Sequence, residues 1–189
     1  YYIRDNRLFE LYILLRYFTK NTIDSKDDLE KLSSAPIIGF IPNFSADSNR
    51  LVVFDKPRSQ ISETFRSLRT NIKYILGEET NEGKIILITS SLPNEGKSLI
   101  SVNVASIFAI SGKKTLLIGY DLRKPALHKI FGLNATHGLT SYMVGRYELD
   151  DVLQATEFNN FDVLVAGPVP PNPSELIDSD KNRALLKEL

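Results

Sequence analysis

The residues of this chain that are best suited to chemistry lie in SLPNEGKS, residues 91–98, between the apolar runs KIILITS and LISVNVASIFAI. Gly96, Lys97 and Ser98 stand at the junction of an expected strand and an expected helix, where they form the end of a Walker A loop. The unpaired N–H groups of residues 94–98 would cradle phosphates at the positive end of the helix dipole. Lys97 would reach the β- and γ-phosphates, and the Ser98 hydroxyl would ligate Mg²⁺. The implied ligand is a magnesium nucleotide, ATP.

This loop departs from the strict Walker pattern at its first position, where Ser91 replaces glycine. The partition and septum-positioning ATPases carry a signature Lys at the second position of the loop, where this chain has Leu92. The difference argues against a close relationship to those ATPases. The nucleotide-binding residues that we expect are Ser91, Asn94, Glu95, Gly96, Lys97 and Ser98.

A second candidate site follows the next expected strand, in LLIGYDLRKP, residues 116–125. An acidic residue at the carboxyl end of a neighbouring parallel strand lies over the phosphate crevice. Asp121 is therefore placed to ligate Mg²⁺ or to accept a proton, and Arg123 to steady the acidic loop. The alternative interpretation is that Asp121 only caps its own turn.

Strand-like and helix-like segments alternate from residue 84 onward. Apolar runs at 84–90, 114–120 and 161–167 predict buried strands. Short helices are expected around 128–132 and 138–145, and a last helix from near Pro173 through Leu189. The alternation predicts an α/β fold, which we interpret as a three-layer P-loop NTPase domain with a mostly parallel sheet.

The segment before this domain predicts an N-terminal helical arm over residues 1–32, with a break near Asn21 and a capping box formed by Ser25 and Asp28. Residues 8–18, LFELYILLRYF, are too few and too charged for a membrane span. They predict a helix that packs on the domain or one that lies just under a membrane. Residues 35–44 predict a strand or an extended docking segment.

Residues 59–76 predict an amphipathic helix. Its apolar stripe, at spacings of three and four residues, consists of Ile61, Phe65, Leu68, Ile72 and Ile75. Glu63 and Arg66 fall away from that stripe, and Arg69 lies near its edge.

The composition excludes several classes of function. The 189 residues include 23 basic and 23 acidic side chains, so the net charge is zero and no general nucleic-acid surface is expected. The absence of cysteine excludes disulfides and thiolate metal sites. His128 and His137 lack the spacing of metal ligands and are interpreted as ordinary residues.

Together these motifs resemble the bacterial tyrosine kinases of capsule and exopolysaccharide biosynthesis, over nearly the whole chain. SLPNEGKS is similar to the Walker A loop of that family, and LLIGYDLRKP to its second acidic motif, usually Asp-x-Asp-x-Arg. GLTSYMVG and VLVAGPVPPNPSELIDS resemble the block before the Walker B strand, and IDSKDDLEKLSSAPIIGFIP the segment that follows the second membrane helix. SETFRSLRTNI is similar to the Glu-x-x-Arg-x-x-Arg motif of ring assembly.

The resemblance implies an ATP-dependent protein-tyrosine autokinase, the cytoplasmic domain of a polysaccharide co-polymerase at the inner membrane of a bacterium. Subunits of a ring-forming homo-oligomer would phosphorylate one another on a C-terminal tyrosine cluster. The implied partners are the polysaccharide export machinery and a tyrosine phosphatase, with no nucleic acid. The implied residues are Lys97, Asp121 and Arg123 for catalysis, and Glu63, Arg66 and Arg69 for oligomerisation.

One residue departs from the family pattern, because Gly119 stands where the first Asp of Asp-x-Asp is usual. We expect a juxtamembrane arm over 1–44 and a kinase domain over 45–189, with a Walker B strand and the tyrosine cluster beyond Leu189. Two alternatives stay open. One is an ATPase switch without protein-kinase activity, and the other is a nucleotide-binding assembly module of a chain-length regulator, catalytically weak through Gly119.

Overall fold

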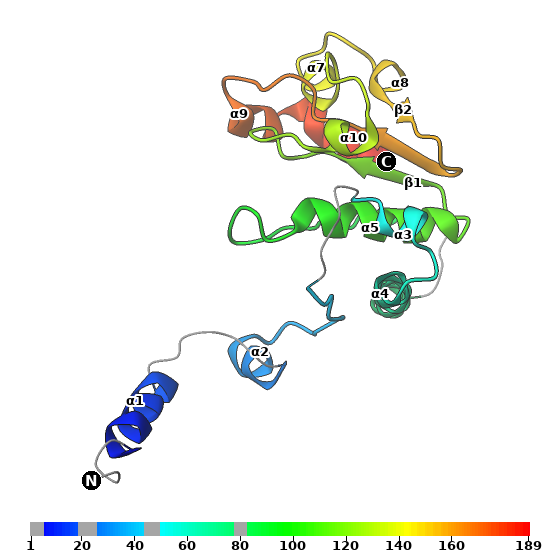
Figure 1. The fold of residues 1–189 in the computed structure, drawn as a ribbon. Helices are drawn as coiled ribbons and strands as arrows, with labels where there is room; N and C mark the ends of the chain where they lie inside the picture. Colours follow the sequence, from blue (N-terminus) through cyan, green and yellow to red (C-terminus); the bar gives the residue numbers. More distant parts are fainter. Residues whose placement is uncertain (1–5, 19–25, 44–49, 78–82) are drawn as a thin grey trace. The chain divides into compact units, whose positions relative to one another are not determined.

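The structure is a computed structural model, and it describes residues 6–18, 26–43, 50–77 and 83–189. The chain divides into two compact units, Tyr1–Ile37 and Ile38–Leu189. The described residues of the first unit form two helices, α1 (Asn6–Phe18) and α2 (Lys26–Leu32), as the sequence predicts (Figure 1). The predicted break at Asn21 and the Ser25 part of the capping box lie outside the described residues.

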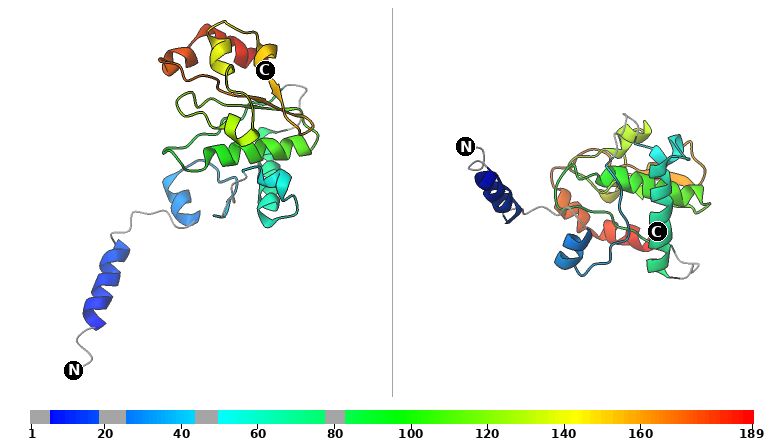
Figure 2. Two further views of the ribbon diagram at one scale, coloured as in Figure 1. Left: turned by 45° about the horizontal axis from the view of Figure 1, so that its top comes forward. Right: turned by 60° about the horizontal axis from the view of Figure 1, so that its bottom comes forward.

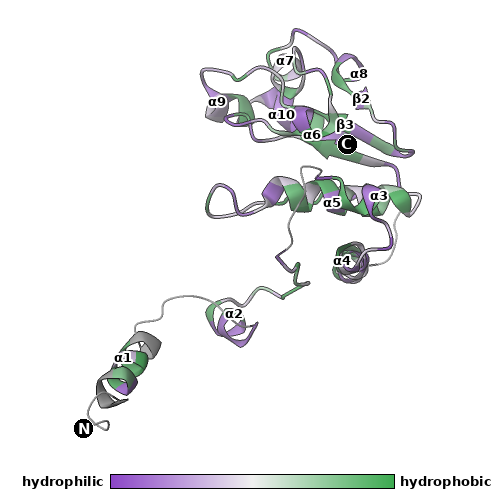
Figure 3. Ribbon diagram, in the orientation of Figure 1, coloured by the Kyte–Doolittle hydropathy of each residue, from purple (hydrophilic) through white to green (hydrophobic). Residues whose placement is uncertain are grey.

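Helix α1 exposes an apolar surface. The side chains of residues 9–15 are all exposed, and Figure 3 colours the described part of the helix mainly as apolar. Among the helices that the structure describes, none combines the length and the hydropathy needed to cross a bilayer.

The second unit combines a small sheet with eight described helices. In chain order its elements are α3 (Val52–Asp55), α4 (Gln60–Leu76), α5 (Lys97–Ile110), β1 (Thr115–Ile118), α6 (Leu127–Phe131), α7 (Leu139–Met143), α8 (Leu149–Val152), β2 (Gln154–Ala155), β3 (Phe161–Leu164), α9 (Pro173–Ile177) and α10 (Asp180–Glu188).

The sheet has the strand order β1-β3-β2. Strand β1 pairs with β3 in parallel, and the short β2 pairs with β3 in antiparallel orientation. The sheet is therefore mixed, and its two long strands are the predicted apolar runs at 114–120 and 161–167.

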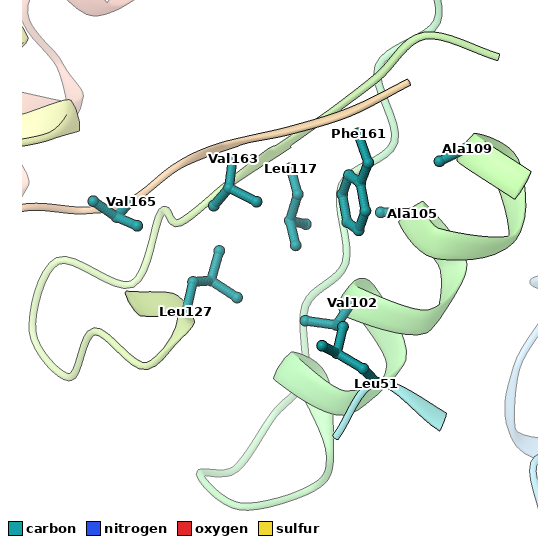
Figure 4. Close-up of a cluster of buried hydrophobic side chains, with 9 residues drawn as sticks. All are labelled: Leu51, Val102, Ala105, Ala109, Leu117, Leu127, Phe161, Val163 and Val165. Atoms are coloured by element: carbon teal, nitrogen blue, oxygen red, sulfur yellow. The ribbon is translucent and has the colours of Figure 1, made fainter. Parts of the chain in front are cut away.

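Both faces of the sheet are buried. One face packs side chains of β1 and β3, such as Leu117 and Val163, against Val102 and Ala105 of α5 (Figure 4). The other face packs Leu164 against side chains of α7 and α10. Because neighbouring residues of a strand point to opposite faces, packing on both faces explains why both strands are mostly apolar, with the exposed Asp162 of β3 as an exception.

Helix α5 is buried on two sides, since α4 lies on the side of α5 that faces away from the sheet (Figures 1 and 2). Phe65 and Leu68 of α4 pack there with Ile107 of α5. The N-terminus of α4 is capped by Ser59, whose Oγ accepts a hydrogen bond from the Ser62 N–H at 3.3 Å. The predicted amphipathic helix is thus confirmed.

The prediction of the apolar stripe of α4 is wrong for one residue, Ile75. Ile75 is 54% exposed, and Leu76 packs in its place against the buried side chains between α4 and α5, the α4–α5 cluster. Near the end of the helix, only one of these two neighbouring residues can face α5, since successive residues are about 100° apart.

The strand predicted at 84–90 is also not observed. Residues 83–90 form no ladder with any described segment, and Ile85 and Leu87 are 61% and 81% exposed. Only Ile88 packs against the α4–α5 cluster. An apolar run becomes a buried strand only where a neighbouring strand pairs with it, and no described segment takes that position.

Two further segments differ from the prediction. The single last helix is divided into α9 and α10, because Ser179 starts a new helix by accepting the Asn182 N–H at 3.3 Å. Residues 35–43 form no strand. Within the second unit, however, Ile38 and Ile41 pack on the α4–α5 cluster, as a docking segment would.

Candidate functional site

The loop that carries the predicted phosphate site leads directly into α5, whose first residue is Lys97. Its backbone is left-handed at Asn94 (φ 67°) and at Gly96 (φ 93°). A Cβ added at Gly96 would meet nothing within 4 Å, so the backbone conformation rather than crowding favours glycine. The space beside the Gly96 backbone is therefore open to a ligand. Ser91, at the start of the loop, is exposed.

The loop presents a row of N–H donors. The Leu92 N–H donates to Glu95 Oε2 at 3.0 Å. For the N–H groups of residues 94–98, by contrast, no acceptor is found within the described part of the chain. These donors lie at the N-terminus of a helix of 14 residues, where the helix dipole favours an anion. The loop therefore fits a phosphate group.

The Lys97 side chain folds back over the loop. Its Nζ donates to Ser90 Oγ at 2.9 Å and lies 3.5 Å from the Leu92 carbonyl oxygen. The ammonium group is thus held above the same loop in which the N–H groups of residues 94–98 have no described acceptor. The role of Ser90 was not predicted, although its position as the last hydroxyl before the loop was a usable signal.

Glu95 stabilises the loop through its side chain. The Leu92 N–H, together with the nearby Ser90 hydroxyl and Lys97 ammonium, lowers the pKa of the Glu95 carboxyl group. A carboxylate repels a phosphate, so the contribution of Glu95 to nucleotide binding is expected from its backbone N–H rather than from its side chain.

Asp121 occupies the second predicted site, after β1. Its Oδ1 accepts hydrogen bonds from the N–H groups of Arg123 at 3.2 Å and Lys124 at 2.9 Å. The carboxylate therefore caps its own turn, as the alternative interpretation expected, and these bonds also fix its position. Within the described residues Oδ2 has no hydrogen-bond partner. Arg123 contacts the carboxylate through its backbone, and its guanidinium group makes no described contact.

Packing brings Asp121 to the same end of the domain as the phosphate loop. Only four residues separate the end of α5 from the start of β1, and the two elements pack on each other. Helix α5 rises by about 20 Å over its length. The chain from Thr115 to Asp121 returns by about the same distance when it is extended, at roughly 3.3 Å per residue. Asp121 and Lys97 are therefore at the same level of the fold.

Ser98 and Asp121 are the residues that would hold Mg²⁺. One hydroxyl and one carboxylate, completed by phosphate oxygens and water, match the oxygen ligands that Mg²⁺ prefers. Among the described residues, no group of three or more His, Cys, Asp or Glu side chains could hold a metal without such help. The donor set thus fits a metal that arrives with its nucleotide.

Tyr120 links the Asp121 turn to α10. Its hydroxyl donates to Asn182 Oδ1 at 2.6 Å, and the Asn182 Nδ2 donates to the Ile177 carbonyl at 2.6 Å. Burial raises the pKa of the half-buried Tyr120 hydroxyl. This contact was not predicted, because it joins residues that are far apart in the sequence.

Gly119 lies in a crowded place. A Cβ there would lie 3.2 Å from the Ala166 nitrogen and 3.3 Å from Leu127 Cδ1. The Gly119 N–H donates to the Leu164 carbonyl at 2.8 Å, so the residue continues the ladder with β3. A side chain at this position would press on β3 and α6.

The predicted oligomerisation residues lie apart from the phosphate loop, on α4. Arg66 forms an ion pair with Glu63 and donates to the Pro57 carbonyl at 2.7 Å. Arg69 donates to the carbonyl of Ile107 at 3.3 Å. Ile107 is ten residues beyond Lys97 on α5, or about 15 Å along the helix.

No family model matches the sequence. The chain is 46% identical over 139 residues to CapB of Staphylococcus aureus, a match that covers 74% of this chain and 60% of CapB. It is 41% identical over 138 residues to the tyrosine-protein kinase YwqD of Bacillus subtilis, covering 73% of this chain and 57% of YwqD. The chain thus spans about 60% of the length of these two relatives.

Solved structures agree with these relatives. The chimerical protein CapA2B2 matches with a TM-score of 0.76 and 40% identity, over 87% of this chain and 70% of that chain. The kinase domain of the Escherichia coli tyrosine kinase ETK matches with a TM-score of 0.80 and 32% identity, over 88% of this chain and 68% of that chain. The chain belongs to the family of bacterial tyrosine kinases of capsule and exopolysaccharide biosynthesis.

Proposed function

We propose that this chain carries the nucleotide site of an ATP-dependent protein-tyrosine autokinase. The observation that carries the proposal is the loop before α5, where the N–H groups of residues 94–98 have no described acceptor and the Lys97 ammonium lies over the same loop. The relatives named as tyrosine kinases support this reading of the loop over that of an ATPase switch.

The proposed reaction is transfer of the γ-phosphoryl group of ATP to a tyrosine hydroxyl. The phosphorus–oxygen bond to the tyrosine forms while the bond from the γ-phosphorus to the bridging oxygen breaks, and ADP leaves. Lys97 and the loop N–H groups hold the β- and γ-phosphates. Asp121 accepts the tyrosine proton directly or through water, and its turn fixes the carboxylate for that purpose.

Mg²⁺ would be held by Ser98 and Asp121 and would supply charge neutralisation at the phosphates. A missing carboxylate at Gly119 need not abolish transfer, because phosphoryl transfer depends mainly on positioning and charge stabilisation. We therefore propose a slow kinase rather than an inactive one.

The finer parts of the function follow from the resemblance. We propose a three-layer P-loop domain at the cytoplasmic face of the bacterial inner membrane. In this proposal, subunits assemble into a ring through Glu63, Arg66 and Arg69 and phosphorylate one another. The remaining proposed partners are the polysaccharide export machinery and a tyrosine phosphatase.

The kinase proposal is tested by following the γ-phosphate. The intact protein is incubated with Mg²⁺ and ATP labelled at the γ-phosphorus, and the label is divided between phosphotyrosine and inorganic phosphate. Label in phosphotyrosine supports the kinase. Label in inorganic phosphate alone, with none on protein, would instead establish an ATPase switch.

The assembly proposal has a separate test. Arg66→Glu combined with Arg69→Glu should convert the oligomer into monomers in light scattering, while Lys187→Glu on α10 should not. Loss of the surface ion pair between Glu63 and Arg66 should change the free energy of unfolding of the monomer by about 1 kcal/mol or less. An unchanged oligomer in the double variant would contradict the assembly role.

A further inference from the structure

A cleft of about 710 Å³ opens next to the turn that Asp121 caps. Arg50, from the segment before α3, lines one part of it, and residues 124–126 and 128–130, around the start of α6, line the rest. Lys124 belongs both to this lining and to the turn, because its N–H donates to the Asp121 carboxylate. The cleft therefore begins at the proposed acceptor site without including the phosphate loop.

The polar side chains that line the cleft are all basic. They are Arg50, Lys124, His128 and Lys129, and none of them has an ion-pair or hydrogen-bond partner for its side chain among the described residues. Among the described residues, no acidic side chain lines the cleft. The chain as a whole has no net charge, so this concentration of basic groups is local. Such a cluster attracts an anion that can pair with several cations at once.

The two parts of the cleft are held together by buried contacts. Asn103 of α5 is fully buried, and its Nδ2 donates to the Arg50 carbonyl at 2.8 Å. Its Oδ1 accepts the Val53 N–H at 3.0 Å. Leu51 and Leu127, which flank the cleft in the sequence, belong to the same core cluster (Figure 4). The cleft is therefore a built feature of the fold rather than a gap between mobile side chains.

The lining also includes an apolar part, formed by Pro125, Ala126 and Ile130. A ligand that matches both parts has a flat apolar body and a multiply charged anionic end. A phosphotyrosine side chain has this combination, with a charge of about −1.5 to −2 near neutral pH. The volume of the cleft also lies within the range of about 300–1,000 Å³ that is common for ligand sites.

We infer that this cleft binds a phosphotyrosine side chain of a polypeptide, adjacent to the site where the next tyrosine of the same polypeptide is phosphorylated. The inference rests on the proposed function, because a tyrosine kinase generates this group. Binding of a first phosphotyrosine would hold a neighbouring tyrosine near Asp121, so that phosphorylation of a multi-tyrosine segment becomes progressively more efficient.

Binding is measured without catalysis. The probe is a fluorescein-labelled peptide with two phosphotyrosines, compared with the same peptide carrying tyrosine at both positions. Fluorescence anisotropy with the intact, nucleotide-free protein should show that the phosphopeptide binds at least about ten-fold more tightly, as expected for charge-assisted contacts to a phosphate. Arg50→Glu combined with Lys129→Glu should remove that difference, and the matched control Lys187→Glu should retain it.

Three results would overturn the inference. The first is equal binding of the two peptides, and the second is an equal loss of phosphopeptide binding in Lys187→Glu, which would indicate unspecific charge attraction. The third is binding of vesicles rich in anionic lipid through Arg50 and Lys129 when the phosphopeptide does not bind, which would assign the cleft to a membrane surface. Retained binding of Mg-ATP and an unchanged melting temperature in the double variant establish that it is folded.

The two proposals fail separately. If the intact protein makes phosphotyrosine but the double variant binds the phosphopeptide like the parent, the cleft is not the site and the kinase proposal stands. If no phosphotyrosine forms but the cleft variants lose phosphopeptide binding, the cleft is a recognition site and the kinase proposal is wrong.

Discussion

Two apolar segments of this chain, residues 84–90 and 114–120, look alike in sequence and differ in the structure. The second contains β1, pairs in parallel with β3 and places Leu117 in the core. The first forms no ladder with a described segment and exposes Leu87. Yet each leads into a loop that carries chemistry, the phosphate loop after the first and the Asp121 turn after the second.

The difference shows that apolar character and strand propensity do not determine burial alone. Residues 114–120 are fixed because β3 pairs with one side of their backbone and their side chains pack in two core clusters. Residues 84–90 are held mainly through Ile88 and through the helix that follows. The site therefore combines one loop anchored by a helix with one turn anchored by a sheet.

The largest effect is expected at the turn that follows the paired segment. Asp121→Ala removes the only carboxylate that the Asp121 turn provides, and it also removes the two hydrogen bonds that fix that turn. We expect autophosphorylation by the intact protein to fall by at least about 100-fold, the lower range for general acid–base catalysis. Asp121→Asn, which can still cap the turn, should be nearly as inactive. Activity at the parent rate in Asp121→Asn would reduce Asp121 to a turn cap.

The contrast between the two segments is tested directly by truncating one leucine in each. Leu117→Ala should destabilise the 189-residue chain by about 2–5 kcal/mol, because it opens a cavity in the core. Leu87→Ala should change its stability by no more than about 0.5 kcal/mol, because the side chain is 81% exposed. Urea unfolding gives both values. Equal losses would mean that residues 84–90 are paired and buried in solution.

A smaller effect is expected where the paired segment contacts α10. Tyr120→Phe removes the hydrogen bond to Asn182 and leaves the buried Asn182 Oδ1 without that donor. The expected loss of stability is about 1–3 kcal/mol. Because Tyr120 directly precedes Asp121 and makes no described contact with the phosphate loop, kcat should fall by a larger factor than the Kd for Mg-ATP rises. A changed Kd with an unchanged kcat would place Tyr120 at the nucleotide instead.

The fold could be predicted where the signal is local. The apolar stripe predicted α4, and the buried runs predicted β1 and β3. The strand at 84–90 could not be excluded from the sequence, since its burial depends on a neighbour. The division between α9 and α10 was missed because the cap at Ser179 overrides an otherwise continuous helical pattern.

In the candidate site, too, features with a local signal in the sequence were predicted and features that depend on packing were not. The phosphate loop was predicted because its glycine, lysine and serine are consecutive in the chain and form a recognisable motif. The contact between Lys97 and Ser90 and the contact between Tyr120 and Asn182 depend on how segments pack. The contact between Tyr120 and Asn182 has no signature in spacing or composition.

Lys97 has the central role that we propose in this protein, because it would hold the phosphates of ATP for transfer to tyrosine. The direct test is Lys97→Met in the intact protein, with Lys187→Met as the matched control and phosphotyrosine measured by mass spectrometry after incubation with Mg-ATP. Lys97→Met should fold normally, bind Mg-ATP more weakly in calorimetry and form no phosphotyrosine, while Lys187→Met behaves like the parent. Normal phosphotyrosine in Lys97→Met would contradict the assignment of this loop as the kinase site.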